Sequence, residues 1–286
     1  MNSNSITEQS GFAHLADLPC YLLRCGQATA VISSYGAHLL SYKPTADVDV
    51  IYLSPDAVWQ NNSAIRGGVP VCWPWFGPAA AEFSPAGQKL SNHGVVRTEF
   101  WELTGQAVTE DCVRIDFRIK TNALPYADAP SYLCLTLELT DTELTLKLQS
   151  DAGLQQAALH SYFAISSVHD VSVGSLAGPY IDKVRAGQGF TQQQPELRFA
   201  EEIDRVYLAT ADDLILKQQN TAVQIKQQGH DSSVLWNPWI DKAAALKDLP
   251  DEGYLDFICV ETARLELNNR TPLQLVQQIR YVGQLE

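Results

Sequence analysis

Residues 132–150, YLCLTLELTDTELTLKLQS, alternate apolar and polar side chains with a period of two. Successive side chains of a β-strand point to opposite faces, so this period is typical of strands rather than helices. The leucines at odd positions of 133–139 would share one face, and those at even positions of 144–148 would return along a second strand. Asp141 and Thr142 separate the two runs and offer a turn. The segment therefore predicts an antiparallel hairpin.

The same alternation recurs along the chain, while helical patterns are few and short. VRIDFRIK (113–120) again places its apolar residues on one face and its charged residues on the other. Further strands are expected at 28–35, 222–228, 232–237, 255–262 and 272–282. DKAAALKDLP (241–250) predicts a helix of about two turns, and SPDAVW (54–59) predicts one turn more. Clusters of Pro and Gly predict long loops at 67–87 and 174–189.

Many strands at short spacing predict an all-β fold, a large antiparallel β-sandwich with a few short helices. Such sandwiches often exceed about two hundred residues as one unit, so the 286-residue chain is not expected to divide. We expect a polar N-terminal tail at 1–12 and a single domain over 13–286.

Charge and cysteine usage narrow the class of protein. The formal net charge is -13 at pH 7, so no global attraction to nucleic acid or to an anionic membrane is expected. No apolar run is long enough for a transmembrane helix, and the N-terminus lacks the pattern of a signal peptide. The six cysteines form no CxxC pair, which argues against a zinc or redox site and favours a reducing cytoplasm. We expect a cytoplasmic monomer that needs no metal and no cofactor.

Two histidines and one glutamate stand out by their neighbours. His160 interrupts an apolar run in ALHSYFAI, and His93 adjoins a glycine in SNHGVVRTEFW. Glu261 follows four apolar residues in FICVETARL, where a buried carboxylate needs a partner or a use. A lone histidine is more often structural than catalytic, and spacing alone does not bring these three together.

Arginines and aromatics offer a second set of candidates. Arg66 precedes two glycines in IRGGVPVCWPWFGP, and Arg97 follows His93 by four residues. The guanidinium fork matches phosphate oxygens, although without further context two surface salt bridges are the more common explanation of such arginines. Aromatics that include Trp236 could stack on a sugar ring or belong to the core. Asp204 precedes a predicted strand in EEIDRVYL and could be a cap residue. Together these residues suit acid–base chemistry on a phosphorylated sugar.

Six segments resemble, in order, motifs of the D-hexose-6-phosphate mutarotases (glucose-6-phosphate 1-epimerases) of the aldose 1-epimerase superfamily. They are IRGGVPVCWPWFGP, HGVVRTEFWEL, LHSYF, DRVYL, LWNPW and FICVETARL. The resemblance runs from about residue 13 to the C-terminus. It implies a galactose mutarotase-like β-supersandwich that interconverts the α and β anomers of a hexose 6-phosphate.

The resemblance also implies roles for single residues. His160 would be the general acid and Glu261 the general base, and a bell-shaped pH profile would report the carboxylate at low pH and the imidazole at high pH. Arg66 and Arg97 would bind the substrate near its phosphate, and Asp204 would hold sugar hydroxyls.

The remaining site residues follow from the same motifs. His93 would lie close to the sugar ring, and Trp236 would stack on it. Related sequences often carry glutamine where this chain has Asn92, whose amide is one methylene shorter. Gly67 and Gly68 would let the backbone approach the sugar phosphate, and the WPWF segment would form a rigid wall. GSLAGPYIDK also resembles a family loop, with Tyr180, Asp182 and Lys183 near the rim of the site.

Two other functions remain open from the sequence. A glycoside hydrolase could use Asp204 and Glu261 as its pair of carboxylates. A carbohydrate-binding or sugar-phosphate-binding protein without catalysis could use the same fold, because fold does not determine function.

Overall fold

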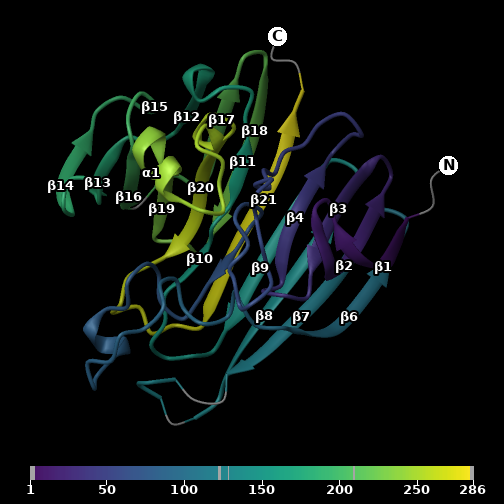
Figure 1. The fold of residues 1–286 in the computed structure, drawn as a ribbon, viewed down its shortest axis with the longest axis horizontal. Coiled ribbons are helices and arrows are strands. Elements are labelled where there is room, and N and C mark those ends of the chain that lie inside the picture. Colours follow the sequence, from purple (N-terminus) through teal and green to yellow (C-terminus); the bar gives the residue numbers. More distant parts are fainter. Residues whose placement is uncertain (1–3, 122–123, 128, 209, 284–286) are drawn as a thin grey trace.

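Three antiparallel sheets make up the fold (Figure 1). The computed structural model describes residues 4–121, 124–127, 129–208 and 210–283. The sheets have four, eight and nine strands. The expected all-β sandwich with few helices is confirmed.

The N-terminal sheet contains four strands that pair in chain order. They are β1 (Ser5–Phe12), β2 (Leu15–Cys25), β3 (Ala28–Ser33) and β4 (His38–Lys43). Residues 5–12 were expected in a tail, but they pair with β2 from Ser5 opposite Arg24 onward. β1 is an edge strand without a fully buried residue, so its sequence carries no apolar alternation.

The eight-stranded sheet holds most of the site described below. Its main path is β14 (Gln188–Gln192), β13 (Gly178–Asp182), β16 (Ile203–Leu208), β19 (Ser232–Asn237), β20 (Phe257–Arg264), β10 (Ala157–Leu159) and β5 (Val71–Cys72). β11 (Tyr162–Ala164) pairs with the first residues of β20, whereas β10 pairs with its last three. Every residue of β20 is buried, which places this strand at the centre of the fold.

The nine-stranded sheet contains the hairpin predicted from the sequence. Its order is β15 (Glu196–Arg198), β12 (Val171–Gly174), β17 (Asp213–Gln218), β18 (Thr221–Gln228), β21 (Leu273–Val282), β9 (Glu143–Ser150), β8 (Ser131–Leu139), β7 (Val113–Thr121) and β6 (Glu102–Val108). Leu139 pairs with Leu144 next to the turn between β8 and β9, so that prediction is confirmed.

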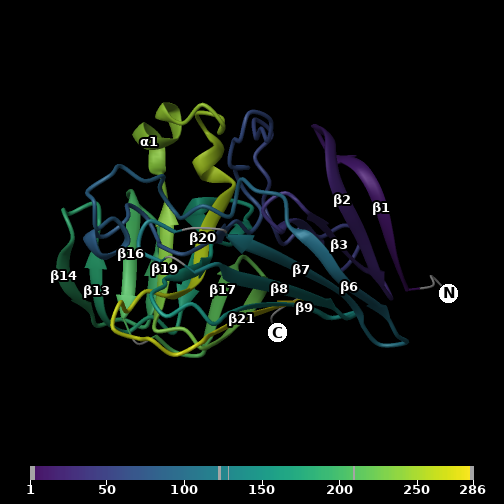
Figure 2. The same ribbon diagram turned by 90° about the horizontal axis from the view of Figure 1, so that it is seen from below.

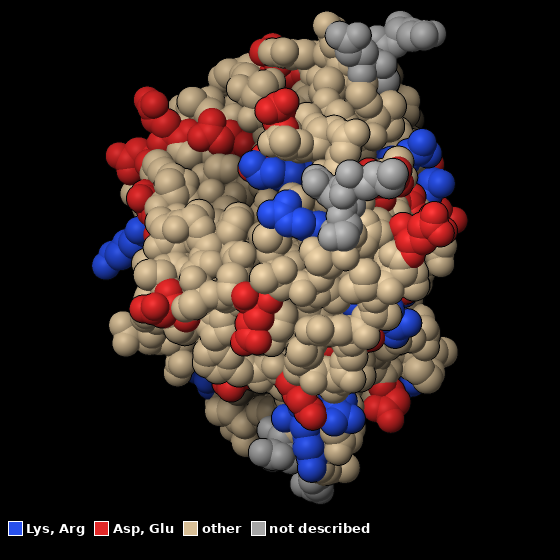
Figure 3. Space-filling view, turned by 90° about the vertical axis from the view of Figure 1, so that its right-hand side faces the viewer, with Lys and Arg blue, Asp and Glu red and all other residues tan. Residues whose placement is uncertain are grey.

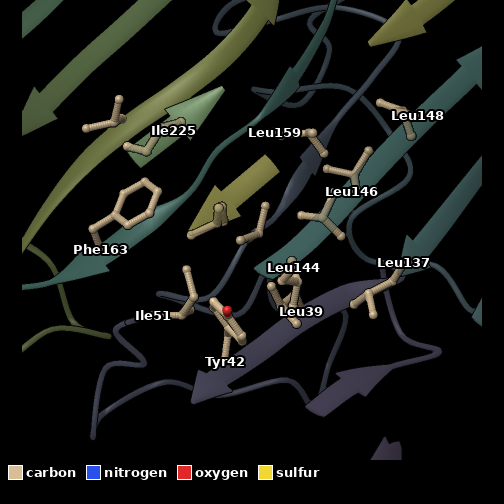
Figure 4. Close-up of a cluster of buried hydrophobic side chains, with 14 of the residues drawn as sticks. Leu39, Tyr42, Ile51, Leu137, Leu144, Leu146, Leu148, Leu159, Phe163 and Ile225 are labelled. Atoms are coloured by element: carbon tan, nitrogen blue, oxygen red, sulfur yellow. The ribbon is translucent and has the colours of Figure 1, made fainter. Parts of the chain in front are cut away.

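The nine-stranded sheet forms the common layer of the sandwich. The N-terminal sheet packs over β6–β8 of the nine-stranded sheet (Figure 2). The eight-stranded sheet contacts the nine-stranded sheet where β20 lies against β21. One continuous apolar core joins all three sheets, and Figure 4 shows part of it, including Leu39 of β4, Leu146 of β9 and Leu159 of β10. Strands that bury one face each thus enclose a shared interior.

Helices are short, and two local expectations differ from the structure. α1 (Trp239–Ala245) confirms the helix expected near 241–250, and one-turn 3-10 helices occur at η1 (Ala81–Phe83), η2 (Val168–Asp170) and η3 (Gly253–Leu255). Residues 54–59 form a turn closed by Ala57 and Ser54 rather than a helix, because Pro55 suits the second position of a β-turn. The loop expected at 174–189 instead contains β13.

Acidic and basic side chains are interspersed on the face shown in Figure 3 rather than gathered into one basic patch. Among the described residues, no helix combines the length and the apolar character needed to span a bilayer.

Candidate active site

A cavity of about 810 Å³ opens beside β16, β19 and β20. It is lined by all eight residues that the sequence singled out for a site: Arg66, Asn92, His93, Arg97, His160, Asp204, Trp236 and Glu261. They come from segments almost two hundred residues apart: Asp204, Trp236 and Glu261 lie on paired strands of the eight-stranded sheet, and the others lie in segments outside its strands.

His160 and Glu261 face each other at the floor of the cavity. The Nε2 atom of His160 lies 3.3 Å from Oε1 of Glu261. Leu159 pairs with Thr262 and Tyr162 pairs with Cys259, so the register between these pairs sets His160 opposite Glu261. Adjacent strands therefore position the two side chains directly.

Both groups are buried, and each retains an unused polar atom. Glu261 is 1 % exposed and His160 is 9 % exposed. Nδ1 of His160 and Oε2 of Glu261 have no hydrogen-bond partner among the described residues. Burial raises the pKa of Glu261 well above its usual value, although the nearby Lys183 ammonium opposes this. Burial also lowers the pKa of His160 well below its usual value, with His93 and Arg66 adding to the effect.

His93 is held in a defined tautomer at the side of His160. Its Nδ1 accepts a hydrogen bond from the backbone N–H of Gly77 at 3.3 Å, so in the neutral ring the proton is on Nε2. Burial, with Arg97 and Lys183 nearby, lowers the pKa of His93 to about 3. The ring centroid lies 5.5 Å from that of His160. His93 is therefore a neutral hydrogen-bond donor beside the acid–base pair.

Two side-chain contacts hold the Arg66 guanidinium at the cavity. Its Nε is 3.2 Å from Oδ1 of Asp248, and its Nη1 donates to the hydroxyl of Tyr162 at 3.0 Å. The Tyr162 ring stacks on His160, with centroids 5.0 Å apart and an interplanar angle of 15°. The guanidinium is thus held in one orientation beside the histidine. No motif pointed to Asp248, which contacts Arg66 across a separation of 182 residues.

Asp204 and Trp236 are direct neighbours on β16 and β19. Burial raises the pKa of Asp204, while Lys183, 3.6 Å from its Oδ1, offsets part of this effect. The Lys183 ammonium also lies 4.5 Å from the ring centroid of Phe76. Lys183 lines the cavity, whereas Tyr180 and Asp182 do not, and Asp182 is buried in an ion pair 3.4 Å from Arg205.

Arg97 and Asn92 also line the cavity. Nη2 of Arg97 donates to the backbone carbonyl of Asn92 at 3.1 Å, and the Asn92 side chain is exposed at the rim. Lys242 and Lys247 complete the charged lining from the α1 side. The described lining residues thus include five lysines and arginines but only three carboxylates, so the cavity favours an anion in a protein of net charge -13.

The glycines and tryptophans of 67–76 do not have the roles expected from the sequence. A Cβ on Gly67 would lie 2.6 Å from the Tyr52 carbonyl oxygen, and one on Gly68 would lie 2.3 Å from the Leu39 carbonyl oxygen. These glycines therefore permit close packing of chain segments rather than approach to a ligand. Trp73 and Trp75 are fully buried, so only Phe76 of the WPWF aromatics lines the cavity.

No group of three or more His, Cys, Asp or Glu side chains within the described residues is arranged to hold a metal ion. The polar lining includes the His160–Glu261 pair, two further carboxylates, hydrogen-bond donors and five cations. Such an arrangement can exchange protons with an anionic polyhydroxy ligand.

The chain is similar to members of one known family. The sequence profile described as "Aldose 1-epimerase" matches residues 19–275. A protein from Escherichia coli (strain K12) is 34% identical over 262 residues, covering 89% of this chain and 87% of its own, and is named "Putative glucose-6-phosphate 1-epimerase". A Salmonella typhimurium protein of the same name is 31% identical, covering 93% of this chain and 91% of its own.

A solved structure extends the comparison to the fold. The crystal structure of a "putative mutarotase" from Salmonella typhimurium superposes with a TM-score of 0.87 and 28% sequence identity. The match covers 98% of this chain and 97% of that chain.

Proposed function

Because this chain belongs to the aldose 1-epimerase family, we propose that it is an isomerase that interconverts the α and β anomers of a hexose 6-phosphate. The observation that carries the proposal is the buried His160–Glu261 pair, 3.3 Å apart, with one unpartnered polar atom on each residue. Related proteins named glucose-6-phosphate 1-epimerases support the choice of substrate class.

The reaction requires one proton to leave and one to arrive. Glu261 takes the proton of the anomeric hydroxyl while His160 gives a proton to the ring oxygen. The bond between C1 and the ring oxygen breaks, and a C1 aldehyde forms. Rotation about C1–C2 presents the other face of the aldehyde, and the two transfers then run in reverse. Each group ends in its starting protonation state.

The other lining residues bind the substrate in this proposal. Trp236 stacks on the ring, while Asp204 and the Nε2–H of His93 bind hydroxyl groups. Arg66 and Arg97 bind the 6-phosphate, which explains the excess of cations in the cavity.

The two other functions have less support. Glu261 lies against His160 and Asp204 lies against Lys183, so neither carboxylate faces the other as its nearest charged partner. A binding protein without catalysis would have no need of two buried, unpartnered proton-transfer atoms, whose burial is costly.

The test is anomer exchange of glucose 6-phosphate measured by saturation-transfer NMR. The protein is expected to increase the exchange rate between the α and β signals in proportion to enzyme concentration, and heat-denatured protein is the control. Binding of glucose 6-phosphate without faster exchange would contradict the proposal and would favour the non-catalytic alternative.

Replacing Arg66 by Ala should raise KM for glucose 6-phosphate by about ten- to hundredfold. A hydrogen bond to a charged group contributes about 1.5–3 kcal/mol, and this variant removes one to the phosphate. The KM for free glucose should change much less, as NMR exchange kinetics with both sugars would show.

Arg198→Ala is the matched control, because the Arg198 side chain is 69% exposed and pairs with Glu196 outside the cavity. Equal increases in KM for both sugars in the Arg66 variant would exclude a role in phosphate recognition.

A further inference from the structure

A set of buried polar side chains lies directly behind the acid–base pair. Ser161 follows His160 in the chain, and Thr262 follows Glu261. Neighbouring residues of extended strands point to opposite faces, so Ser161 and Thr262 face the interior between the two large sheets. Both are fully buried.

One side chain from the opposite sheet contacts both of these residues. Gln277 of β21 is 0 % exposed, and its Oε1 accepts a hydrogen bond from the hydroxyl of Ser161. Its Nε2 donates to the Thr262 hydroxyl at 2.9 Å and to the backbone carbonyl of Val260 at 3.3 Å. Gln277 therefore binds the chain next to His160 and on both sides of Glu261.

A second buried amide continues the network. Gln227 of β18 is the direct cross-strand neighbour of Gln277. Its Oε1 accepts from Thr262 at 2.9 Å, and its Nε2 donates to Ser233 at 2.8 Å. Ser233 precedes Val234, the residue of β19 that pairs with Glu261 of β20. The network thus reaches β19, β20 and the residue that follows His160.

Simple packing does not explain amides at these positions. The space between two sheets is normally filled by apolar side chains, and polar groups there must be fully hydrogen-bonded to be tolerated. A hydrogen-bonded amide has directional contacts, whereas a leucine of similar size could shift against its neighbours. The Gln277 contacts therefore restrain the spacing between the segments that carry His160 and Glu261.

We propose that Gln277 is a positioning residue that holds His160 and Glu261 at proton-transfer distance by binding Ser161, Thr262 and Val260 behind them. This inference rests on the function proposed above. It implies that part of the geometry of the active site is set from the opposite sheet, by a residue that does not line the cavity.

The test compares Gln277→Leu with Gln155→Leu. Gln155 is also buried, at 1 % exposure, but its amide binds Trp73 and Ala152 outside the network. Gln277→Leu should lower kcat for glucose 6-phosphate anomer exchange by about tenfold to hundredfold, because misplacement by about 1 Å can cost roughly 10²-fold. Its KM should stay within about threefold of wild type, since no lining residue is changed.

A second measurement does not depend on activity. In ¹⁵N-histidine-labelled protein, the imidazole signals of His160, assigned by their loss in His160→Asn, should shift in Gln277→Leu and stay in place in Gln155→Leu. The shift would support the positioning role even if wild type failed to exchange anomers, in which case only the proposed function would be rejected.

A purely structural role would have a different result. Gln277→Leu would then lower the unfolding midpoint as Gln155→Leu does, with wild-type kcat and unchanged His160 signals, and the proposal would be overturned. If Gln277→Leu does not fold, Ser161→Ala removes one of the three contacts more mildly. It should reduce kcat less than tenfold and move the same signals, and unchanged signals would again overturn the proposal.

Discussion

Replacing Glu261 by Gln is expected to lower kcat for anomer exchange by about 10²–10⁴-fold, with KM changed only a few fold. A positioned general base contributes a factor of this size, and an amide cannot accept the proton. Gln is almost isosteric with Glu and removes a buried carboxylate, so the variant should fold. Saturation-transfer NMR at several substrate concentrations separates kcat from KM.

The same loss is expected from His160→Asn, and the double variant should be little worse than either single variant. The two residues serve one proton exchange, so their effects are not additive. Glu266→Gln is the control, because Glu266 is exposed on the same segment beyond β20. A Glu261→Gln variant that retains more than about a tenth of wild-type kcat would not be compatible with a general base at this position.

The pH profile gives an additional readout for this variant. Burial raises the pKa of Glu261 and lowers that of His160, so both shifts disfavour the charged Glu261–His160 pair that catalysis uses. Activity should fall at low pH as the pair takes a second proton, and at high pH as the pair loses its last proton. In Glu261→Gln only His160 of the pair still titrates, and it must carry a proton to act as the acid, so the low-pH limb should disappear.

Replacing Gly94 by Ala is expected to destabilise the protein by more than about 4 kcal/mol, a loss that few single substitutions reach. Gly94 has a φ of +79°, and an added Cβ would lie 1.8 Å from the carbonyl oxygen of Trp73. That oxygen already accepts a hydrogen bond from the backbone N–H of Val95 at 2.9 Å, so it cannot move away without breaking the contact. Urea denaturation followed by tryptophan fluorescence measures the free energy of unfolding.

Gly87→Ala separates the cost of backbone strain from the cost of the contact with Trp73. Gly87 has a similar φ of +70°, but no atom lies within 4 Å of an added Cβ. It should therefore cost only the backbone strain, about 1–2 kcal/mol. Equal losses in the two variants would show that the contact with Trp73 has no effect on stability.

The fold was predictable where the alternation of apolar residues was regular. The β8–β9 hairpin buries the leucines of one face, and each of them appears in the sequence at the expected position. β1 was missed because Ser5–Phe12 lies at an edge and buries no residue fully. A strand of this kind is stabilised by its hydrogen bonds to a neighbour, and those leave no pattern in its own sequence.

The candidate site was predictable as a set of residues but not as a geometry. The motifs named all eight residues, and the structure places them in one cavity. The contact of Arg66 with Asp248 and the bonds of Gln277 depend on the register of strands far apart in the chain. The roles of Gly67 and Gly68 depend on which backbone lies beside them. Residue identity alone could not supply such long-range information.

The register that sets His160 opposite Glu261 has a consequence for how this protein can tolerate changes in length. One residue inserted between Leu159 and Tyr162 would offset the pairing with β20 and direct a different side chain toward the cavity. Insertions in exposed turns, such as the one between β8 and β9, disturb no such pairing. During divergence, chain length should therefore vary at the turns and stay constant in the short segment around His160.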